Sequence, residues 1–243
     1  MVLYLSGCWA RFCPALFHII LLLLLTLSIP VHINAASADS FKTKEYLNST
    51  GLDFIRAADA YALGYTGAGI ALGIIDTAVR GDHPELAGKV RMIALPFDAT
   101  TGQQYVPNWV YDTHASHVAG IMAAMRNGIG MHGVAFDADL VSAAILGRAS
   151  GSDENLVPPD LLSLFAAYPD IRVINNSWGS NFYPSLDPLK DIPADVISGL
   201  DGNIKTLRKL SDEYGKVMVF AGGNDSMPAP SVEGMMPRYA PDL

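Results

Sequence analysis

The sequence predicts an α/β fold, with a mostly parallel sheet and helices on both of its faces. Several short segments are apolar throughout, which is typical of parallel strands buried on both sides. Segments with helical spacing of apolar or small residues separate them, as expected for β-α-β units. We expect strands at 70–76, 140–146, 171–176 and 216–221, and helices at 114–125, 158–168 and 202–214.

The first 38 residues have the pattern of a secretory signal peptide. An apolar run, residues 15–31, follows a segment whose one full charge is Arg11, and the small-residue pattern Ala36-Ser37-Ala38 comes next. This order predicts cleavage after Ala38. An uncleaved membrane anchor is the alternative, because the run is nearly long enough to span a bilayer.

Composition then limits the rest of the chain. Of all residues in the chain, 50% are hydrophobic and 16% are charged, which is enough apolar material for one sizeable core. One globular domain is therefore expected after the signal. The net charge of −8 argues against nucleic acid as a partner. Both cysteines, Cys8 and Cys13, lie in the predicted signal, so we expect no disulfide, zinc-thiolate site or cysteine nucleophile in the exported part.

The segment 39–69 is expected to be an N-terminal extension of the main domain, which would occupy 70–243. Within it, one helix is predicted from the spacing of four apolar residues, and the glycines that begin at Gly64 would end that helix. The four residues are Leu52, Ile55, Ala58 and Ala62.

A single carboxylate, Asp76, ends the first predicted strand. In open parallel sheets, functional residues gather outside the carboxyl ends of the strands, which is where Asp76 would lie. The alternative is a local capping role, which is common for Asp-Thr after a strand.

The helix predicted from His114 carries small residues along one side. Ser116, Gly120 and Ala124 recur at a spacing of four, with alanines beside them, so another element could approach closely. His114 and His117 could also form a metal pair, but no H-E-x-x-H pattern accompanies them, and a buried structural role is expected for His117.

The stretches IIDTAVRGDHPEL and HASHVAGIMAA resemble the Asp and His segments of the subtilisin-like serine proteases, the subtilases. The resemblance implies a subtilisin-like fold, protein or peptide substrates, and catalytic roles for Asp76 and His114 in the chain order Asp, His, Ser. It fits the chemistry, because a serine nucleophile needs a base, and that base needs a carboxylate to orient it.

Two further stretches are similar to subtilase motifs. VINNSWG resembles the strand that pairs with substrate, which implies that Ser177, Trp178 and Gly179 line the cleft. Alternatively, Trp178 fills the core at a strand end. VMVFAGGNDS resembles the A-A-G-N motif, which implies that Asn224 donates a hydrogen bond to the oxyanion, although Asn after Gly-Gly is also an ordinary turn residue.

The nucleophile segment of the family, G-T-S-M-[AS], does not occur in this sequence. Ser226 is two residues from Asn224 and is followed by Pro228, so it does not fit that position. We therefore expect a fold that is incomplete at its C-terminal end and a catalytic domain represented by its N-terminal part. Ala78 replaces a family glycine and would be strained if the backbone there needed positive φ.

The short distance from residue 39 to Asp76 leaves no room for a globular pro-domain, and this resembles autotransporter passenger domains. Export to the cell surface or medium is expected, with the periplasm as an alternative, and membrane contact only through the signal or a C-terminal translocator.

No cofactor is certain, and structural calcium stays an option. The competing hypothesis is an inactive subtilase-like module that binds peptides. Nucleotide binding is disfavoured, because the glycines of GYTGAGIALGI precede a strand.

Overall fold

A computed structural model of the chain describes residues 36–93, 113–144, 159–179, 194–224 and 234. The described residues all belong to one compact unit, residues 36–243. The helices are η1 (Ala38–Phe41), α2 (Lys44–Asn48), α3 (Thr50–Phe54), α4 (Ala57–Ala62), α5 (His114–Ala123), α6 (Pro159–Leu164), η2 (Phe165–Ala167) and α7 (Ala194–Asp212). The strands are β1 (Ala71–Asp76), β2 (Val90–Met92), β3 (Asp139–Ala144), β4 (Ile171–Asn176) and β5 (Val217–Phe220).

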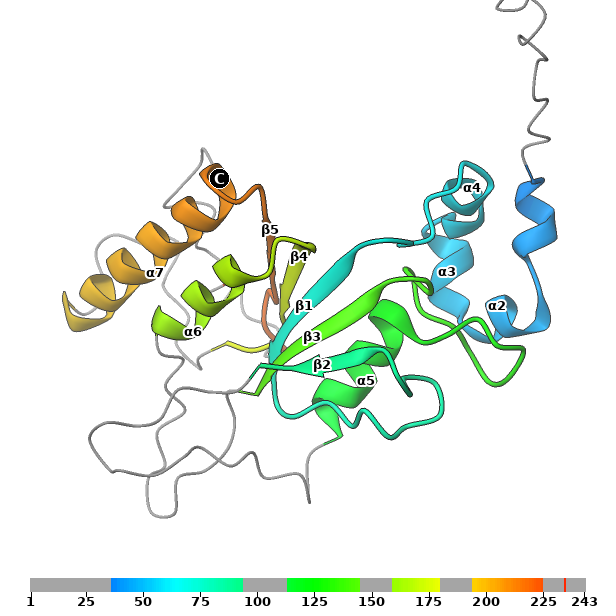
Figure 1. The fold of residues 1–243 in the computed structure, drawn as a ribbon, viewed down its shortest axis with the longest axis horizontal. Helices are drawn as coiled ribbons and strands as arrows, with labels where there is room; N and C mark the ends of the chain where they lie inside the picture. The colour runs from blue at the N-terminus through cyan, green and yellow to red at the C-terminus, as the bar shows by residue number, and fades with distance from the viewer. Residues whose placement is uncertain (1–35, 94–112, 145–158, 180–193, 225–233, 235–243) are drawn as a thin grey trace, which may run out of the picture. The chain divides into compact units, whose positions relative to one another are not determined.

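The strands form one sheet in the order β2-β3-β1-β4-β5, and all of the pairings are parallel (Figure 1). The predicted parallel sheet is therefore confirmed, and β1 lies at its centre. All six residues of β1 are buried, as its unbroken apolar run predicts. Because the strands are parallel, the residues that follow each of them lie along the same edge of the sheet.

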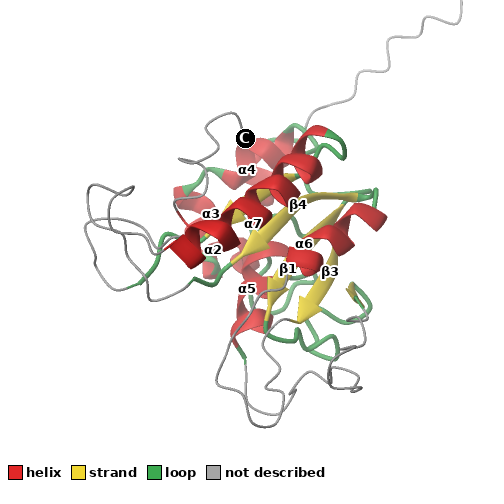
Figure 2. Ribbon diagram, turned by 90° about the vertical axis from the view of Figure 1, so that its left-hand side faces the viewer, coloured by secondary structure: helices red, strands yellow, loops and turns green. Residues whose placement is uncertain are grey.

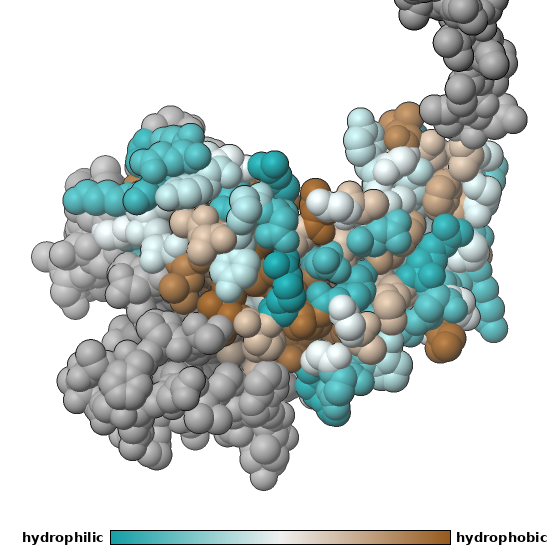
Figure 3. All heavy atoms as spheres, viewed as in Figure 1, coloured by the Kyte–Doolittle hydropathy of each residue, from teal (hydrophilic) through white to brown (hydrophobic). Residues whose placement is uncertain are grey.

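Helices cover both faces of the sheet (Figure 2). On one face, Ala115, Ala119 and Ala123 of α5 pack against Leu72 and Ile74 of β1. On the other face, a second apolar cluster joins α6, η2 and α7 to β1, β3 and β4; it includes Leu162, Phe165, Leu207, Leu210, Val141 and Ile174. The visible surface of the C-terminal half of α7 is hydrophilic (Figure 3), as expected of a helix with one side in the core.

Several predicted boundaries were wrong. The helix expected over 202–214 begins at Ala194, because Gly199 and Gly202 lie within it rather than ending it. The helix expected over 114–125 ends at Ala123. The short strand β2 was missed, since it has three residues and is partly exposed. Residues 145 and 146, expected to continue β3, lie outside the described residues.

The predicted N-terminal helix is broken into α3 and α4. Arg56 separates them in a left-handed conformation, with φ 57° and ψ 39°. Leu52 and Ala58 are buried as expected, but Ile55 is 55% exposed. The break allows Tyr61 to join Tyr46 and Phe136 in a third cluster, which the periodicity of one continuous helix did not predict.

The chain that follows α5 satisfies the C-terminal carbonyl groups of that helix. The amide groups of Gly133, Val134 and Ala135 donate to Ala124 O, Ile121 O and Met122 O, at 3.0, 3.0 and 2.8 Å. These carbonyl groups have no partner within the helix, so the returning loop anchors its end. Gly133 is needed here, because a Cβ would lie 2.4 Å from Ala123 N and 2.6 Å from Ala124 N.

Replacing Gly133 by alanine is therefore expected to lower the free energy of unfolding by about 3 kcal/mol, the upper end of ordinary overpacking costs. Both close contacts are backbone atoms, which cannot rotate away. Urea unfolding would measure the effect. Gly202→Ala in α7 is the matched control, because a Cβ there meets no described atom within 4 Å, and it should stabilise by about 0.5–1 kcal/mol. Equal stability of the two variants would contradict the prediction.

Candidate active site

The carboxylate of Asp76 lies at the end of β1 and is 1% exposed. Its Oδ1 atom accepts a hydrogen bond from the amide of Thr77 at 2.7 Å and a second from the Thr77 hydroxyl at 3.2 Å. A buried ionised carboxylate is costly unless hydrogen bonds compensate it. The strand end thus holds the carboxylate in a fixed place.

His114 is the first residue of α5, and its ring meets this carboxylate. Its Nδ1 atom lies 2.7 Å from Asp76 Oδ1, and its side chain is 54% exposed. Contact with the carboxylate favours the tautomer that carries hydrogen on Nδ1, which leaves a lone pair on Nε2. The pair therefore presents a held imidazole that can accept a proton.

Both ends of α5 are anchored, and this fixes the position of His114. At the far end, Lys89 Nζ donates to Ala123 O at 2.7 Å and to Phe136 O at 2.5 Å. Burial lowers the pKa of the Lys89 amino group. A cation at a helix C-terminus is favourable, because the free carbonyl groups there carry partial negative charge.

Thr77 connects the two catalytic candidates, and no sequence motif had indicated a role for it. Besides donating to Asp76, its Oγ1 atom accepts a hydrogen bond from the amide of Ala115 at 3.1 Å. That amide is one of the first in α5, which have no partner within the helix. The sequence signal was the polar residue directly after Asp76, but only the structure shows where its hydroxyl group points.

Thr77→Val should lower the free energy of unfolding by about 1–3 kcal/mol, because the buried amide of Ala115 loses its acceptor. Thr77→Ser keeps the hydroxyl group and should cost clearly less. Urea unfolding of the two variants separates the hydroxyl from the methyl group. If the serine variant were as unstable as the valine variant, packing of the methyl group would explain the loss.

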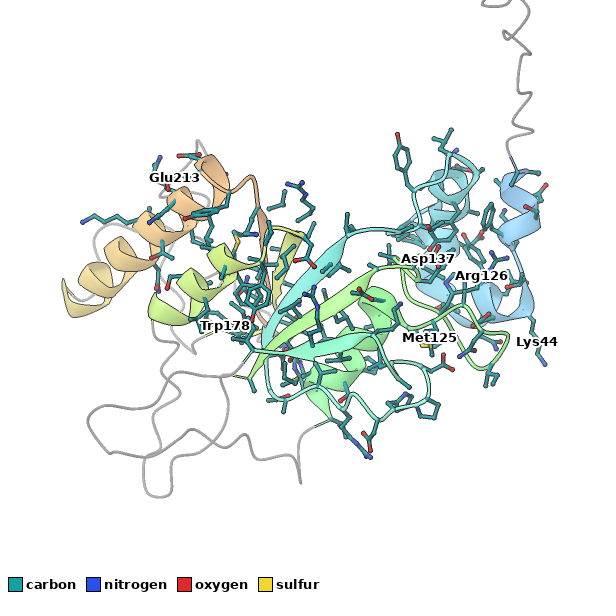
Figure 4. All side chains as sticks on the ribbon, in the orientation of Figure 1. Lys44, Met125, Arg126, Asp137, Trp178 and Glu213 are labelled. Atoms are coloured by element: carbon teal, nitrogen blue, oxygen red, sulfur yellow. The ribbon has the colours of Figure 1, made fainter. Side chains whose placement is uncertain are left out.

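The end of β4 lies beside Asp76 in the sheet. Asn175 Nδ2 donates to Ser177 Oγ at 2.8 Å. Trp178 is partly buried; its ring packs against Phe220 with 6.2 Å between ring centroids, in an edge-to-face arrangement (Figure 4). The packing role expected as an alternative for Trp178 is thus present, while Gly179 is exposed and Ser177 partly exposed. A role of these three residues in substrate binding stays a prediction.

Asn224 follows β5 at the same edge of the sheet. The ladder continues past the strand, since Ala221 N donates to Asn176 O at 3.0 Å. Gly223 has φ 100°, which glycine adopts without strain, and the chain turns there. Asn224 is exposed after this turn. Because β4 lies between β1 and β5, Asn224 is two strands away from Asp76.

Two expectations from the sequence are corrected. His117 is exposed rather than buried, because it lies away from the alanine side of α5 that packs on the sheet. Ala78 is buried without positive φ; among the described residues other than glycine, positive φ occurs at Arg56. The replacement of the family glycine therefore causes no backbone strain at position 78.

Within the described parts of the chain, no three His, Cys, Asp or Glu side chains gather where they could hold a metal ion. Acidic side chains near α5 bind protein groups instead. Glu85 Oε2 accepts from Asn127 Nδ2 at 3.2 Å. Glu45 accepts from the amides of Asn127 and Gly128, both at 2.9 Å.

A buried carboxylate, an imidazole and a parallel sheet occur together in many hydrolases, so sequence comparison decides between families. The model of the subtilase family matches residues 67–243. The chain belongs to the subtilase family. The resemblance of its Asp and His segments to serine proteases of this family is therefore confirmed.

Curated subtilase relatives are much longer than the part that this chain matches. An extracellular serine protease of Serratia marcescens is 43% identical over 146 residues, which are 59% of this chain and 13% of that protein. The minor extracellular protease Vpr of Bacillus subtilis (strain 168) is 40% identical over 114 residues, or 43% of this chain and 13% of Vpr. The subtilisin-like protease PopC of Myxococcus xanthus (strain DK1622) is 32% identical over 178 residues, covering 68% of this chain and 35% of PopC.

The solved structure of the prenylagaramide maturation protease PagA is similar in fold. It superposes with a TM-score of 0.51 at 17% sequence identity, over 72% of this chain and 53% of PagA. At this identity the likeness concerns the fold alone. It agrees with a subtilase α/β architecture for the described sheet and helices.

Proposed function

We propose that this subtilase is the N-terminal part of an exported serine endopeptidase, in which Asp76 orients His114. The observation that carries the proposal is the 2.7 Å contact between His114 Nδ1 and a carboxylate that is almost completely buried. The buried carboxylate at the strand end can hold the imidazole in one orientation. The imidazole itself is half exposed, so a nucleophile can reach it, as a general base requires.

In the proposed reaction, His114 Nε2 takes the hydroxyl proton of a serine encoded beyond residue 243, and that oxygen attacks the peptide carbonyl. Asp76 stays ionised and stabilises the imidazolium, which then gives the proton to the leaving amine. The side chain of Asn224 donates to the oxyanion. The substrate lies as an added strand along Ser177, Trp178 and Gly179. Water then releases the acyl group.

Export is the proposed setting of this activity. Two relatives are named extracellular proteases, and the chain begins with an apolar run that resembles a signal peptide. No helix in the described ranges is long and apolar enough to cross a membrane. We propose protein or peptide substrates at the cell surface or in the medium, with an autotransporter passenger as the arrangement and its translocator as the membrane contact.

A second candidate function is a catalytically inactive subtilase module that binds extended peptides. The observation in its favour is that no G-T-S-M-[AS] segment occurs among the 243 residues. Such a module would keep the strand ends at Ser177 and Asn224 but would cut nothing.

To test the proposal, the gene is sequenced beyond the codon for Leu243, and the chain is expressed together with the downstream coding segment. A downstream G-T-S-M-A segment, covalent labelling by a fluorophosphonate and hydrolysis of a casein substrate are the expected results. Loss of labelling when His114 is replaced by alanine would tie the label to the proposed base. A stop codon with no such segment in any frame, together with measurable peptide binding, would favour the inactive module and overturn the protease.

A further inference from the structure

Two unpaired polar atoms lie on the face of the sheet that α5 covers. Among the described residues, the buried side-chain atoms without a hydrogen-bond partner are Asp76 Oδ2, His132 Nε2, Ser142 Oγ, Asn176 Oδ1, Trp178 Nε1 and Asn203 Oδ1. The last three belong to the opposite side of the sheet or to α7, and His132 belongs to the N-terminal aromatic cluster. Asp76 and Ser142 are left on the α5 face.

Strand alternation places them there together. Leu140 packs in the α5-side core, whereas Val141 and Ala143 pack in the opposite core, so Ser142 lies on the α5 face. Asp76 shares that face with Ile74 by the same alternation. In the register of β1 and β3, Ile74 is opposite Ser142 and Asp76 is opposite Ala144, so Ser142 and Asp76 are diagonal neighbours.

The separation is too wide for a direct contact. Strands about 4.8 Å apart with a rise of about 3.3 Å per residue place the Cα atoms of diagonal neighbours roughly 8 Å from each other. Two short polar side chains at this separation can be joined by one water molecule, with hydrogen bonds of about 2.8 Å on each side.

Both the Ser142 hydroxyl group and the Asp76 carboxylate are more stable with a hydrogen-bond partner such as this water molecule. Ser142 is 0% exposed, and its neighbours on the α5 face are Leu140 and Ile74, so a hydroxyl without a partner is unfavourable there. An unpaired oxygen on an ionised carboxylate is more unfavourable still. Within the described residues, the hydrogen bonds of Asp76 all reach Oδ1, which leaves Oδ2 without a donor.

We propose that Ser142 is a positioning residue for Asp76, acting through one buried water that the Ser142 hydroxyl holds and that donates to Asp76 Oδ2. The water fixes the rotation of the carboxylate, so that Oδ1 faces His114 Nδ1. The inference rests on the proposed function, since it assigns Asp76 the task of orienting His114. It adds a second support for that carboxylate, on the side opposite to Thr77.

The test compares Ser142→Ala and Ser142→Thr in the full chain by proton NMR of the His114 Nδ1–H signal. In the unaltered chain we expect a low-field signal and a cross-peak from a long-lived water to the backbone amide of residue 142. Ser142→Ala should remove the cross-peak and speed exchange of the Nδ1–H about tenfold, the equivalent of one net hydrogen bond. Ser142→Thr, which keeps the hydroxyl group, should restore both.

The outcomes separate this inference from the proposed function. A normal Nδ1–H signal that Ser142→Ala leaves unchanged, with a higher melting temperature, would identify Ser142 as an unpaired hydroxyl and overturn the inference alone. Absence of the low-field signal from the unaltered chain would count against the Asp76–His114 pair and therefore against the proposed function. Loss of the cross-peak in the alanine variant but not in the threonine variant supports the water bridge.

Discussion

In the proposed serine endopeptidase, replacing Asp76 by asparagine should lower kcat about 10,000-fold, as loss of the orienting carboxylate does in serine proteases. The amide is nearly the same size, but its N–H2 group cannot accept from His114 Nδ1. It would favour the tautomer with hydrogen on Nε2, which cannot act as a base. Peptide hydrolysis under saturating substrate measures the effect, and KM should change little, because Asp76 is buried and does not reach the substrate.

Asp82→Asn is the matched control for this substitution. Asp82 is exposed and pairs with Arg80 through two contacts of 3.0 and 3.2 Å. Asp82→Asn changes the net charge by the same amount as Asp76→Asn, but it does so outside the site. The kcat should therefore stay within about twofold, as for an exposed ion pair. A loss of less than tenfold in Asp76→Asn would show that His114 is oriented by something else.

Replacing Glu45 by alanine should destabilise the fold by about 2–4 kcal/mol, because two backbone amides lose their acceptor at once. Glu45 is 5% exposed, and its two carboxylate oxygens accept from Asn127 N and Gly128 N. Glu45→Gln keeps one acceptor oxygen and should cost about half as much. The free energy of unfolding in urea is the measurement.

Glu213 provides the control for Glu45, since it is exposed near the end of α7 (Figure 4). Glu213→Ala should change the free energy of unfolding by less than about 0.5 kcal/mol, as exposed sites usually do. If Glu45→Ala and Glu213→Ala were equally stable, the two amides would have found another acceptor, and the loop at 127–128 would not depend on Glu45.

The central strands could be predicted from the sequence because their composition is dictated by burial on both faces. Strand β4 was predicted over its observed range, and β1 to within one residue. The start of α7 could not be predicted in this way, because Gly199 and Gly202 are poor helix formers, yet the helix runs through both. The break at Arg56 was equally hidden, since an arginine with positive φ has no local sequence signal.

In the candidate site, too, some residues could be predicted from the sequence and others could not. Asp76 and His114 could be proposed because each has a local motif, and the structure brings their side chains into contact. Thr77 and Ser142 could not, because their roles depend on where a hydroxyl group points within the packed sheet. The contact between Glu45 and residues 127–128 joins groups that lie 82 and 83 positions apart, which no local pattern encodes.

The way in which the N-terminal helices are held sets an order of events during synthesis. Asn48, Ser49 and Tyr61 bind the carbonyl groups of Gly130, His132 and Val134, and Arg126 lies over the Phe41 and Phe136 rings (Figure 4). A chain is synthesised from its N-terminus, so these helices are made first, and the carbonyl groups that they bind follow 73 to 83 residues later. Until then their aromatic cluster lacks Phe136 and His132, and contacts this distant form slowly. A segment that is still unfolded at this stage can pass through a narrow membrane channel.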